Sequence, residues 1–522
     1  MNLGGREAAA RPSVLHGIIN RALAEPDHPA ALDLERELSY AQLIDEAAQV
    51  GAGMRARGVT EGDRVALLIP NSVDFIVAAL ASLWIGAAFV PLAVTDPLSR
   101  LITVVADSIP KIIVTSSRSD DDLPTSIDDV VPVALDLLRE PRRAPMYTSD
   151  SSRVVYMIYT SGTTGTPKGV QIGDAAFAAA VQSTAHALGL SRTTRTLCVS
   201  PFHFDGSYAN VFPTLVSGGT VIMRPREALL FPRTFFNTVA NEKITYSGFT
   251  PSYLRLLLAS PQISNLRDST LETIALGGET CSAADLRRLW SSAPAIRVFN
   301  RYGPTETTIA VTNIELTPDM IEGGTVTIGR PHPGVSFVLV DDDGEVVETP
   351  NRTSELYIGG VQLMDGYWAD PDLTESVMRR DVVPDQVLYR TGDLVYRNDD
   401  GNYVYVDRAD RVVKRSGVRI SLVELNSLMS QLDHVKVASC LTFDREGDLG
   451  IVAFVAADAE VSALDLRRAA STLIPTNMLP DRIELIATMP LNRSNTLDES
   501  GLLTMAGLRP YRPASRGRSV PT

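Results

Sequence analysis

Short apolar runs alternate with helical patterns along most of the first 330 residues, and this alternation restricts the fold more than any other feature. The runs are rich in Val, Ile and Leu, which is typical of buried strands. Strands that alternate with helices build parallel sheets covered by helices. The sequence therefore predicts strands at residues 65–68, 112–114, 154–158, 221–223, 244–249, 274–276 and 296–299, and helices at 282–292 and at 175–188, the latter capped by Asp174.

The longest apolar run, residues 75–90, contains Ser82 and Gly86 and stops at Pro91. It is short for a membrane span, so we expect a buried helix followed by a strand.

A net charge of −14 argues against nucleic acid or an anionic membrane as the main partner. Residues 1–13 lack the apolar core of a signal peptide. The three cysteines lie far apart and fit no metal or disulfide spacing, which favours a cytoplasmic protein: Cys198, Cys281 and Cys440.

The pattern changes twice in the second half of the chain. Residues 337–347 suggest a hairpin with an Asp-Gly turn and 403–406 another strand, which indicates a β-rich subdomain. Beyond residue 410 the pattern suggests helices at 422–432 and 463–474 and strands at 439–443, 450–455 and 482–487. A chain of 522 residues exceeds the size of one core. We predict an α/β fold with two domains. The large N-terminal domain (1–409) would contain parallel sheets flanked by helices plus the β-rich subdomain, and the C-terminal domain (410–522) would be a small mobile α+β unit. We also expect a disordered basic tail from about residue 509.

The strand predicted at 154–158 ends in the segment Tyr-Thr-Ser-Gly-Thr-Thr-Gly-Thr-Pro-Lys-Gly, residues 159–169. Glycines let the backbone approach an anion closely, and hydroxyls and Lys168 can donate to phosphate. The segment is not a P-loop, because Pro167 and Gly169 flank Lys168 where that motif has Gly and Ser or Thr. A flexible surface loop is the alternative. The density of the motif favours phosphate binding.

Two further motifs follow, Asn-Arg-Tyr-Gly-Pro-Thr-Glu-Thr at 300–307 and Tyr-Arg-Thr-Gly-Asp-Leu at 389–394. With segment 159–169 they make the chain resemble the adenylate-forming enzymes, and within them the amino-acid adenylation domains of nonribosomal peptide synthesis. The resemblance extends from residues 38–40 to about residue 498. Enzymes of this family are ligases that use ATP to convert a carboxylate to an acyl-adenylate and then pass the acyl group to a thiol.

The resemblance implies a role for each motif residue in binding ATP and Mg²⁺. The loop would hold the β- and γ-phosphates, Tyr302 would stack on adenine, and Asp393 would accept both ribose hydroxyls. Thr305 would contact the α-phosphate, and Glu306 would help to hold Mg²⁺, since a hard cation prefers carboxylate oxygen. The implied catalytic residues are Lys168, Thr305, Glu306 and Lys414. The implied ATP site comprises Thr160, Ser161, Gly162, Thr163, Thr164, Gly165, Lys168, Tyr302, Gly303, Thr305, Asp393 and Arg408.

The resemblance also implies a hinge at Asp410, about which the C-terminal domain would turn between adenylation and thioester formation. Lys414, Gly417 and Arg419 match the loop that the family brings to the active site in the second state. The chain departs from the family at Asp407, where Gly is usual, and at residues 415–416, Arg-Ser. The phosphopantetheine tunnel is therefore expected to differ in shape.

Residues 204–207, Phe-Asp-Gly-Ser, resemble the motif whose Asp binds the amino group of the substrate. A carboxylate at the mouth of an apolar pocket suits an ammonium ion, although Asp205 could instead stabilise a turn. His203 could gate the pocket or be structural. Alignment outward from the motifs implies a pocket lined by Gly206, Ala209, Gly248, Ala275, Gly277, Arg301, Ile309 and Ala310.

Arg301 is the unusual member of this set, because a buried guanidinium needs an anion. Three alternatives remain open from the sequence. The anion could be a carboxylate of the substrate, which would make the substrate an acidic amino acid. It could be a neighbouring carboxylate of the protein, or Arg301 could point to solvent.

The family's last motif, Pro-Leu-Thr-x-Asn-Gly-Lys, is altered here. Residues 490–498 read Pro-Leu-Asn-Arg-Ser-Asn-Thr-Leu-Asp, so Thr496 replaces the Lys that bridges the substrate carboxylate and the α-phosphate. Arg493 is the nearest cation. Three hypotheses follow: adenylation is slow, with Arg493 or Mg²⁺ carrying more of the charge; catalysis requires a partner protein; or ATP and substrate bind without efficient adenylation.

We therefore expect a free-standing ligase of natural-product (antibiotic) biosynthesis that transfers an activated amino acid to the phosphopantetheine thiol of a separate acyl or peptidyl carrier protein. The substrate could be a β-amino acid or an α-amino acid with a large or acidic side chain. An acyl-CoA ligase and a non-catalytic binding protein are the alternatives.

Overall fold

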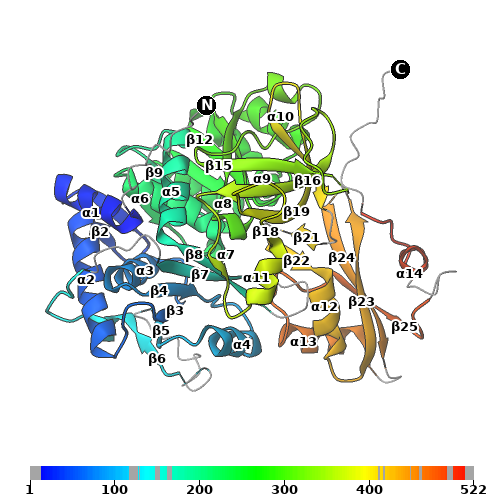
Figure 1. The fold of residues 1–522 in the computed structure, drawn as a ribbon, viewed down its shortest axis with the longest axis horizontal. Helices are drawn as coiled ribbons and strands as arrows, with labels where there is room; N and C mark the ends of the chain where they lie inside the picture. The colour runs from blue at the N-terminus through cyan, green and yellow to red at the C-terminus, as the bar shows by residue number, and fades with distance from the viewer. Residues whose placement is uncertain are drawn as a thin grey trace. The chain divides into compact units, whose positions relative to one another are not determined.

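The computed structural model describes residues 13–116, 127, 130–146, 153–160, 167–341, 343–408, 412–415, 418–446, 448–457, 461–490 and 498–511. The chain forms two compact units, whose elements are labelled in Figure 1. The second unit includes two stretches of the N-terminal half, whereas the sequence placed a single boundary at residue 409; the predicted domain roles stay predictions. The first unit comprises Met1–Val94, Ser108–Ile158 and Gly169–Ala409, and the second Thr95–Asp107, Tyr159–Lys168 and Asp410–Thr522.

The larger sheet of the first unit has eight strands in the order β14-β13-β12-β11-β9-β10-β1-β2. The strands from β13 to β1 run parallel, and β14 and β2 pair antiparallel at the two edges. This arrangement confirms the parallel sheet predicted from the sequence. The strands are β1 (Pro29–Leu32), β2 (Glu37–Ser39), β9 (Arg195–Cys198), β10 (Thr220–Met223), β11 (Tyr246–Phe249), β12 (Thr273–Gly277), β13 (Arg297–Tyr302) and β14 (Thr312–Leu316).

A second sheet has seven strands in the order β17-β8-β7-β4-β3-β5-β6. The strands pair in parallel from β7 through β4, β3 and β5 to β6, and β17 pairs antiparallel with β8. The apolar run at 75–90 forms the buried helix and strand that were predicted, α3 (Val73–Ile85) and β4, which lie side by side in Figure 1. The strands are β3 (Arg64–Leu68), β4 (Ala88–Pro91), β5 (Ile112–Thr115), β6 (Pro132–Ala134), β7 (Val154–Thr160), β8 (Lys168–Gly173) and β17 (Gly366–Tyr367).

Helices alternate with the parallel strands, as the sequence pattern predicted. The prediction of Asp174 as a helix cap is wrong: Gly173 is the N-cap of α5, and Asp174 is its buried first residue, with Oδ2 3.7 Å from Nε of Arg153. A nearby buried cation thus holds the carboxylate that the sequence assigned to capping. The helices are α1 (Val14–Ala24), α2 (Tyr40–Ala56), α4 (Leu98–Ser108), α5 (Asp174–Leu188), α6 (Tyr208–Val216), α7 (Arg226–Leu229), α8 (Pro232–Asn241), α9 (Pro251–Leu258), α10 (Ala283–Ser292) and α11 (Pro371–Val377).

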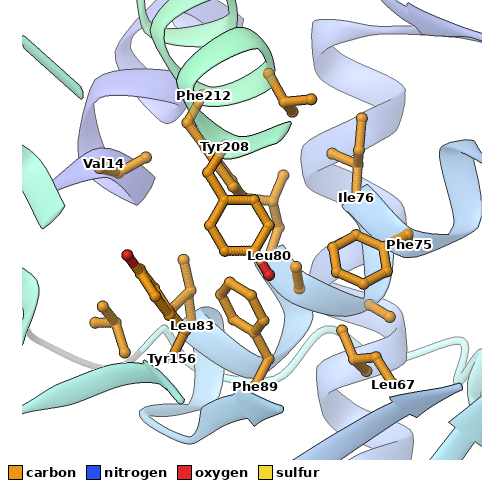
Figure 2. Packing of buried hydrophobic residues seen from close by; sticks show 14 of the residues in the cluster. Val14, Leu67, Phe75, Ile76, Leu80, Leu83, Phe89, Tyr156, Tyr208 and Phe212 are labelled. Carbon is orange, nitrogen blue, oxygen red and sulfur yellow. The ribbon is translucent and has the colours of Figure 1, made fainter. Parts of the chain in front are cut away.

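An aromatic cluster fills the core between α3, β4, β7 and α6 (Figure 2). The ring of Tyr208 packs edge-on against Tyr156, Phe212 and Phe89, with ring centroids 5.2, 5.5 and 5.7 Å apart. Aromatic pairs in this geometry add about 0.5–1.5 kcal/mol beyond the area they bury. Tyr208 is fully buried, so the cluster anchors the N-terminal end of α6.

The β-rich subdomain forms an antiparallel sheet of five strands. The predicted hairpin at 337–347 is only partly correct. Gly344 adopts a left-handed φ of 85°, and Val340 forms a bridge with Val346. The amides of Asp341 and Val347 donate to the carbonyls of Glu345 and Leu339 at 3.0 and 2.8 Å, so the hairpin forms, but its second arm is short and β15 pairs along its length with β16. The strands are β15 (Val335–Val340), β16 (Ser354–Gly360), β18 (Met378–Arg379), β19 (Leu388–Arg397) and β20 (Tyr403–Arg408).

The C-terminal part of the second unit contains a hairpin, a three-stranded sheet and three helices. β23 and β24 pair antiparallel, and β25 joins β24 in parallel. Pro510 forms a bridge with Phe443, so residue 510 still belongs to the fold; the rest of the predicted tail, from residue 512, lies outside the described residues. Nowhere in the described ranges is a helix long and apolar enough to cross a membrane. The elements are β21 (Val412–Arg415), β22 (Val418–Ser421), α12 (Leu422–Ser430), β23 (Val435–Arg445), β24 (Asp448–Ala457), α13 (Ala463–Ser471), β25 (Arg482–Ile486) and α14 (Glu499–Met505).

Candidate active site

Asp205 begins a short 3₁₀ turn, Asp205–Ser207, that continues directly into α6. The hydroxyl of Ser207 donates to the carbonyl oxygen of Phe204 at 2.7 Å and closes this turn. Tyr208 follows and is held in the aromatic core shown in Figure 2. The core thereby fixes the segment that carries Asp205. His203 precedes it, with its ring 4.2 Å from the ring of Phe204, and its gating role stays a prediction.

The carboxyl group of Asp205 is poised for a positively charged ligand. Its Oδ2 atom is buried and accepts no hydrogen bond from any described residue. Burial raises the pKa of Asp205 to about 6, the Thr305 hydroxyl opposes this rise, and the Glu306 carboxylate adds to it. Glu306 is itself fully buried. Two neighbouring carboxylates with little solvent favour the binding of a cation.

Glu306 lies in the 3₁₀ turn Thr305–Thr307, directly after β13. The hydroxyl of Tyr367 donates to its Oε1 at 2.9 Å, and the amide of Met364 donates to its backbone oxygen at 2.9 Å. These contacts fix the carboxylate against β17. Tyr367 was missed in the sequence, since no local pattern links residues 61 positions apart.

The backbone after this turn is strained. Thr308 and Ile309 have left-handed φ values of 58° and 70°, which are costly for β-branched residues. Gly303 permits the fold to close here, because a Cβ atom on it would lie 2.7 Å from Cα of Ala310. The predicted wall residues Ile309 and Ala310 thus lie on a segment that other contacts must hold in place.

Gln362 supplies these contacts. Its Nε2 donates to the carbonyl oxygens of Ala310 at 2.8 Å and Thr308 at 3.3 Å, and its own carbonyl accepts from the Thr308 hydroxyl at 2.8 Å. Its Oε1 lies 2.9 Å from Nδ1 of buried His332, which must therefore carry the proton; Nε2 of His332 accepts from Asn313 at 2.8 Å. Gln362, which the sequence also failed to reveal, positions the pocket wall.

The residues predicted to bind the adenosine part of ATP lie together in the first unit. The hydroxyl of Tyr302 donates to Oδ2 of Asp393 at 2.5 Å, and Nη1 of Arg408 lies 3.2 Å from Oδ1. The Thr391 hydroxyl accepts from the amide of Asp393 at 2.9 Å. Burial and the adjacent Asp393 raise the pKa of Tyr302 well above its usual value, so the phenol keeps its proton. Asp393 is therefore oriented and surrounded by donors.

Arg301 joins four of the predicted pocket residues. Its guanidinium donates to the carbonyl oxygens of Ala209 at 3.2 Å and Ala275 at 3.4 Å. A Cβ atom on Gly248 would lie 2.0 Å from its Nη2, and one on Gly277 would lie 3.3 Å from its Cβ. Arg301 is only 8% exposed, so the alternative in which it points to solvent is wrong.

The remaining predicted residues belong to the second unit, are exposed, or lie outside the described residues. Thr160 ends β7 and Lys168 begins β8, both in the second unit, and Oγ1 of Thr160 is buried without a partner among the described residues. Lys414 lies on β21 opposite Arg419 on β22. Gly206, beside Asp205, is exposed. Residues 161–166, Asp410, Gly417, Arg493 and Thr496 lie outside the described residues.

The cysteines provide no reactive thiol. All three are buried, and burial raises the pKa of Cys198 and Cys281 to about 12. Their thiolate forms are negligible at neutral pH. These buried thiols are therefore unsuited to act as nucleophiles.

Comparisons with known proteins agree with these motifs. A profile of the family described as AMP-binding enzyme matches residues 19–368. Tyrocidine synthase 2 of Brevibacillus parabrevis is 32% identical over 91% of this chain and 13% of its own length. Phenyloxazoline synthase MbtB of Mycobacterium tuberculosis is 30% identical over 95% of this chain and 35% of its own length. The chain therefore spans about a third or less of these two relatives.

Solved structures share the fold. Holo-PA1221, a nonribosomal peptide synthetase protein with adenylation and PCP domains, covers 95% of this chain with a TM-score of 0.84 and 23% identity, over 84% of its own chain. The o-succinylbenzoate CoA synthetase of Bacillus subtilis covers 93% with a TM-score of 0.81 and 22% identity, over 98% of its own chain. The family profile matches most of the chain, and the motifs agree with it in identity and order. We conclude that this chain belongs to the AMP-binding enzymes, the adenylate-forming ligases that use ATP.

Proposed function

We propose that this enzyme activates the carboxylate of an amino acid as aminoacyl-AMP and transfers the aminoacyl group to the phosphopantetheine thiol of a separate carrier protein. The observation that carries the amino-acid assignment is the buried, unpartnered Oδ2 of Asp205 beside the buried carboxylate of Glu306. An acid without an amino group would leave this negative charge uncompensated. A substrate ammonium ion would compensate it.

In the proposed first step an oxygen of the substrate carboxylate attacks the α-phosphorus of ATP, and pyrophosphate leaves. Thr305 lies next to both Asp205 and Glu306, so a substrate held at Asp205 would bring its carboxylate toward a phosphate bound at Thr305. In the second step the carrier thiol attacks the acyl carbon, and AMP leaves. No cysteine of the described chain competes with that thiol.

Mg²⁺ would neutralise charge on the departing pyrophosphate. The buried Glu306, fixed by Tyr367, provides a hard oxygen ligand that fits this ion. The described residues contain no group of three His, Cys, Asp or Glu that could hold a metal by themselves. This fits a magnesium ion that takes its other ligands from ATP phosphates and water.

Support for a carrier protein comes from the relatives. PA1221 contains an adenylation and a PCP domain in one protein. An acyl-CoA ligase is the second candidate, because the o-succinylbenzoate CoA synthetase shares the fold. The two candidates differ in the thiol that accepts the acyl group.

Hydroxylamine trapping of the acyl-adenylate tests the activation step. We expect ATP-dependent hydroxamate with at least one amino acid and none with the same acid lacking its amino group. Equal product from the two acids would contradict the role of Asp205. Products formed with CoA and with a phosphopantetheinylated carrier, compared in parallel, then decide between the two acceptors. Replacement of Arg493 by Ala in the same assay tests whether Arg493 compensates for the Lys replaced by Thr496.

A further inference from the structure

Arg301 is a buried cation without a buried anion. It projects from β13 and is 8% exposed, and its guanidinium donates to two backbone carbonyls and to Oδ1 of Asn210 at 3.3 Å. Across the described ranges no carboxylate forms an ion pair with it. Arg224, whose exposure is comparable at 9%, pairs with Glu242. A charge left in this state is costly unless a ligand compensates it.

The residues around Arg301 hold its guanidinium group in one orientation. The hydroxyl of Tyr246 donates to Oδ1 of Asn210 at 2.8 Å, and Nδ2 of Asn210 donates to the carbonyl of Gly248 at 3.0 Å. These bonds turn Oδ1 of Asn210 toward the guanidinium. Any side chain at position 248 would occupy the place of Nη2. Neutral acceptors therefore orient the guanidinium and leave its charge uncompensated.

The two uncompensated charges of the site have opposite signs, and both meet the segment that begins at Asp205: Asp205 belongs to it, and Arg301 of β13 donates to it. Asp205 starts the turn that leads into α6, and Ala209, whose carbonyl accepts from Arg301, is one helical turn further on. Four residues of helix rise about 6 Å. This spacing suits a small amino acid with its ammonium group at one end and a carboxylate at the other.

We propose that Arg301 makes this site specific for an amino acid that carries a second carboxylate. The inference rests on the proposed function: the ammonium group binds Asp205, the second carboxylate binds Arg301, and the remaining carboxylate is activated. Gly248 and Gly277 leave the space that Arg301 itself fills, and the wall residues Gly248, Ala275 and Gly277 carry no charge of their own. Arg301 is thus a specificity-determining residue rather than a structural filler of the pocket.

Amino-acid-dependent exchange of pyrophosphate into ATP tests this inference. The panel contains aspartate, glutamate and their β-amino isomers, each beside its amide, together with large neutral amino acids. We expect kcat/KM for one dicarboxylic amino acid to exceed that of its amide about 10- to 100-fold, because the difference is a charge-assisted hydrogen bond. A preference for a neutral amino acid would overturn the inference and leave the proposed function intact. Exchange with no amino acid, although ATP binds, would overturn both.

Arg301→Gln removes the charge and keeps a donor for the backbone carbonyls. We expect it to lower kcat/KM for the preferred acid about 10- to 100-fold and kcat/KM for the amide of that acid only severalfold. The KM for ATP should stay unchanged. Arg297→Gln is the matched control, because Arg297 lies on the same strand but is exposed and pairs with Glu315 at 2.8 Å. Arg301→Lys, which keeps the charge, should retain part of the preference even if Arg301→Gln does not fold. Unchanged acid preference in Arg301→Gln, or its complete loss in Arg301→Lys, would contradict a specificity role.

Discussion

The nucleotide end and the substrate end of the first unit treat their charges differently. At the nucleotide end, each oxygen of Asp393 has a partner, Tyr302 or Arg408. At the substrate end, Oδ2 of Asp205 has no partner among the described residues, and Arg301 contacts only neutral oxygens. At the proposed nucleotide end the protein itself supplies a partner for each charge, whereas at the proposed substrate end the described residues do not.

This difference follows from what each end must recognise. Every adenylate-forming enzyme uses ATP, so a preorganised carboxylate can be built once and held by fixed donors. The acid differs between enzymes, and a buried uncompensated charge rejects every substrate that does not compensate it. Substitutions should therefore separate the two ends, with changes in ATP binding at one and in amino-acid binding at the other.

Removal of the negative charge of Glu306 should have the largest effect on the adenylation rate. Glu306→Gln keeps the size of the side chain and can still accept from Tyr367, but it loses the proposed metal ligand. We expect the adenylation rate to fall on the order of 100-fold or more, as for other losses of transition-state charge stabilisation. Pyrophosphate exchange at increasing Mg²⁺ concentration measures this. Glu315→Gln, an exposed control on β14, should behave as wild type, and an equal rate in Glu306→Gln would remove Glu306 from the reaction.

Asp205→Asn should affect the substrate end alone. Loss of the charge that holds the ammonium group should raise the KM for the amino acid about 10- to 100-fold. The KM for ATP should stay constant, because Asp393 and its partners are unaltered. Steady-state kinetics with each substrate varied in turn give both values. A parallel rise in the two KM values would show that the ends are coupled rather than separate.

The pH dependence should show the same separation. Burial raises the pKa of Asp205 from 3.8 to about 6, so the KM for the amino acid should be flat above pH 7 and rise as the pH falls through 6, approaching tenfold per unit. The KM for ATP should not show this step. Because the folded protein binds this proton more tightly than the unfolded chain, Asp205 also makes stability decrease as pH rises from about 4 to 6. Absence of a step near pH 6 in the amino-acid KM would contradict the assignment of Asp205.

The smallest effect is expected at the nucleotide end. Tyr302→Phe keeps the ring and removes one donor to Asp393, so the KM for ATP should rise about 2- to 10-fold while the KM for the amino acid stays constant. Nucleotide affinity measured by calorimetry provides a second readout. Unchanged ATP affinity would mean that Arg408 alone orients Asp393.

The sequence by itself determined the features that depend on neighbouring residues. Alternating runs predicted the parallel strands and α3, because period and turn chemistry are local properties. The motifs at 300–307 and 389–394 pointed to Tyr302, Glu306 and Asp393 through their resemblance to the adenylate-forming enzymes, and the roles of these residues stay predictions. Local reasoning was wrong about Asp174, whose carboxylate lies beside Arg153, whereas the hairpin at 337–347 forms with a short second arm.

Only the tertiary structure decided how the side chains of the site are held. Tyr367 reaches Glu306 across 61 positions, Gln362 reaches Ala310 across 52, and Arg301 reaches Ala209 across 92. Such contacts leave no periodic trace in the sequence, because each depends on which strands and helices pack together. For the same reason the sequence left three alternatives for Arg301, and its burial beside neutral oxygens became visible only once β11, β12, β13 and α6 were placed around it.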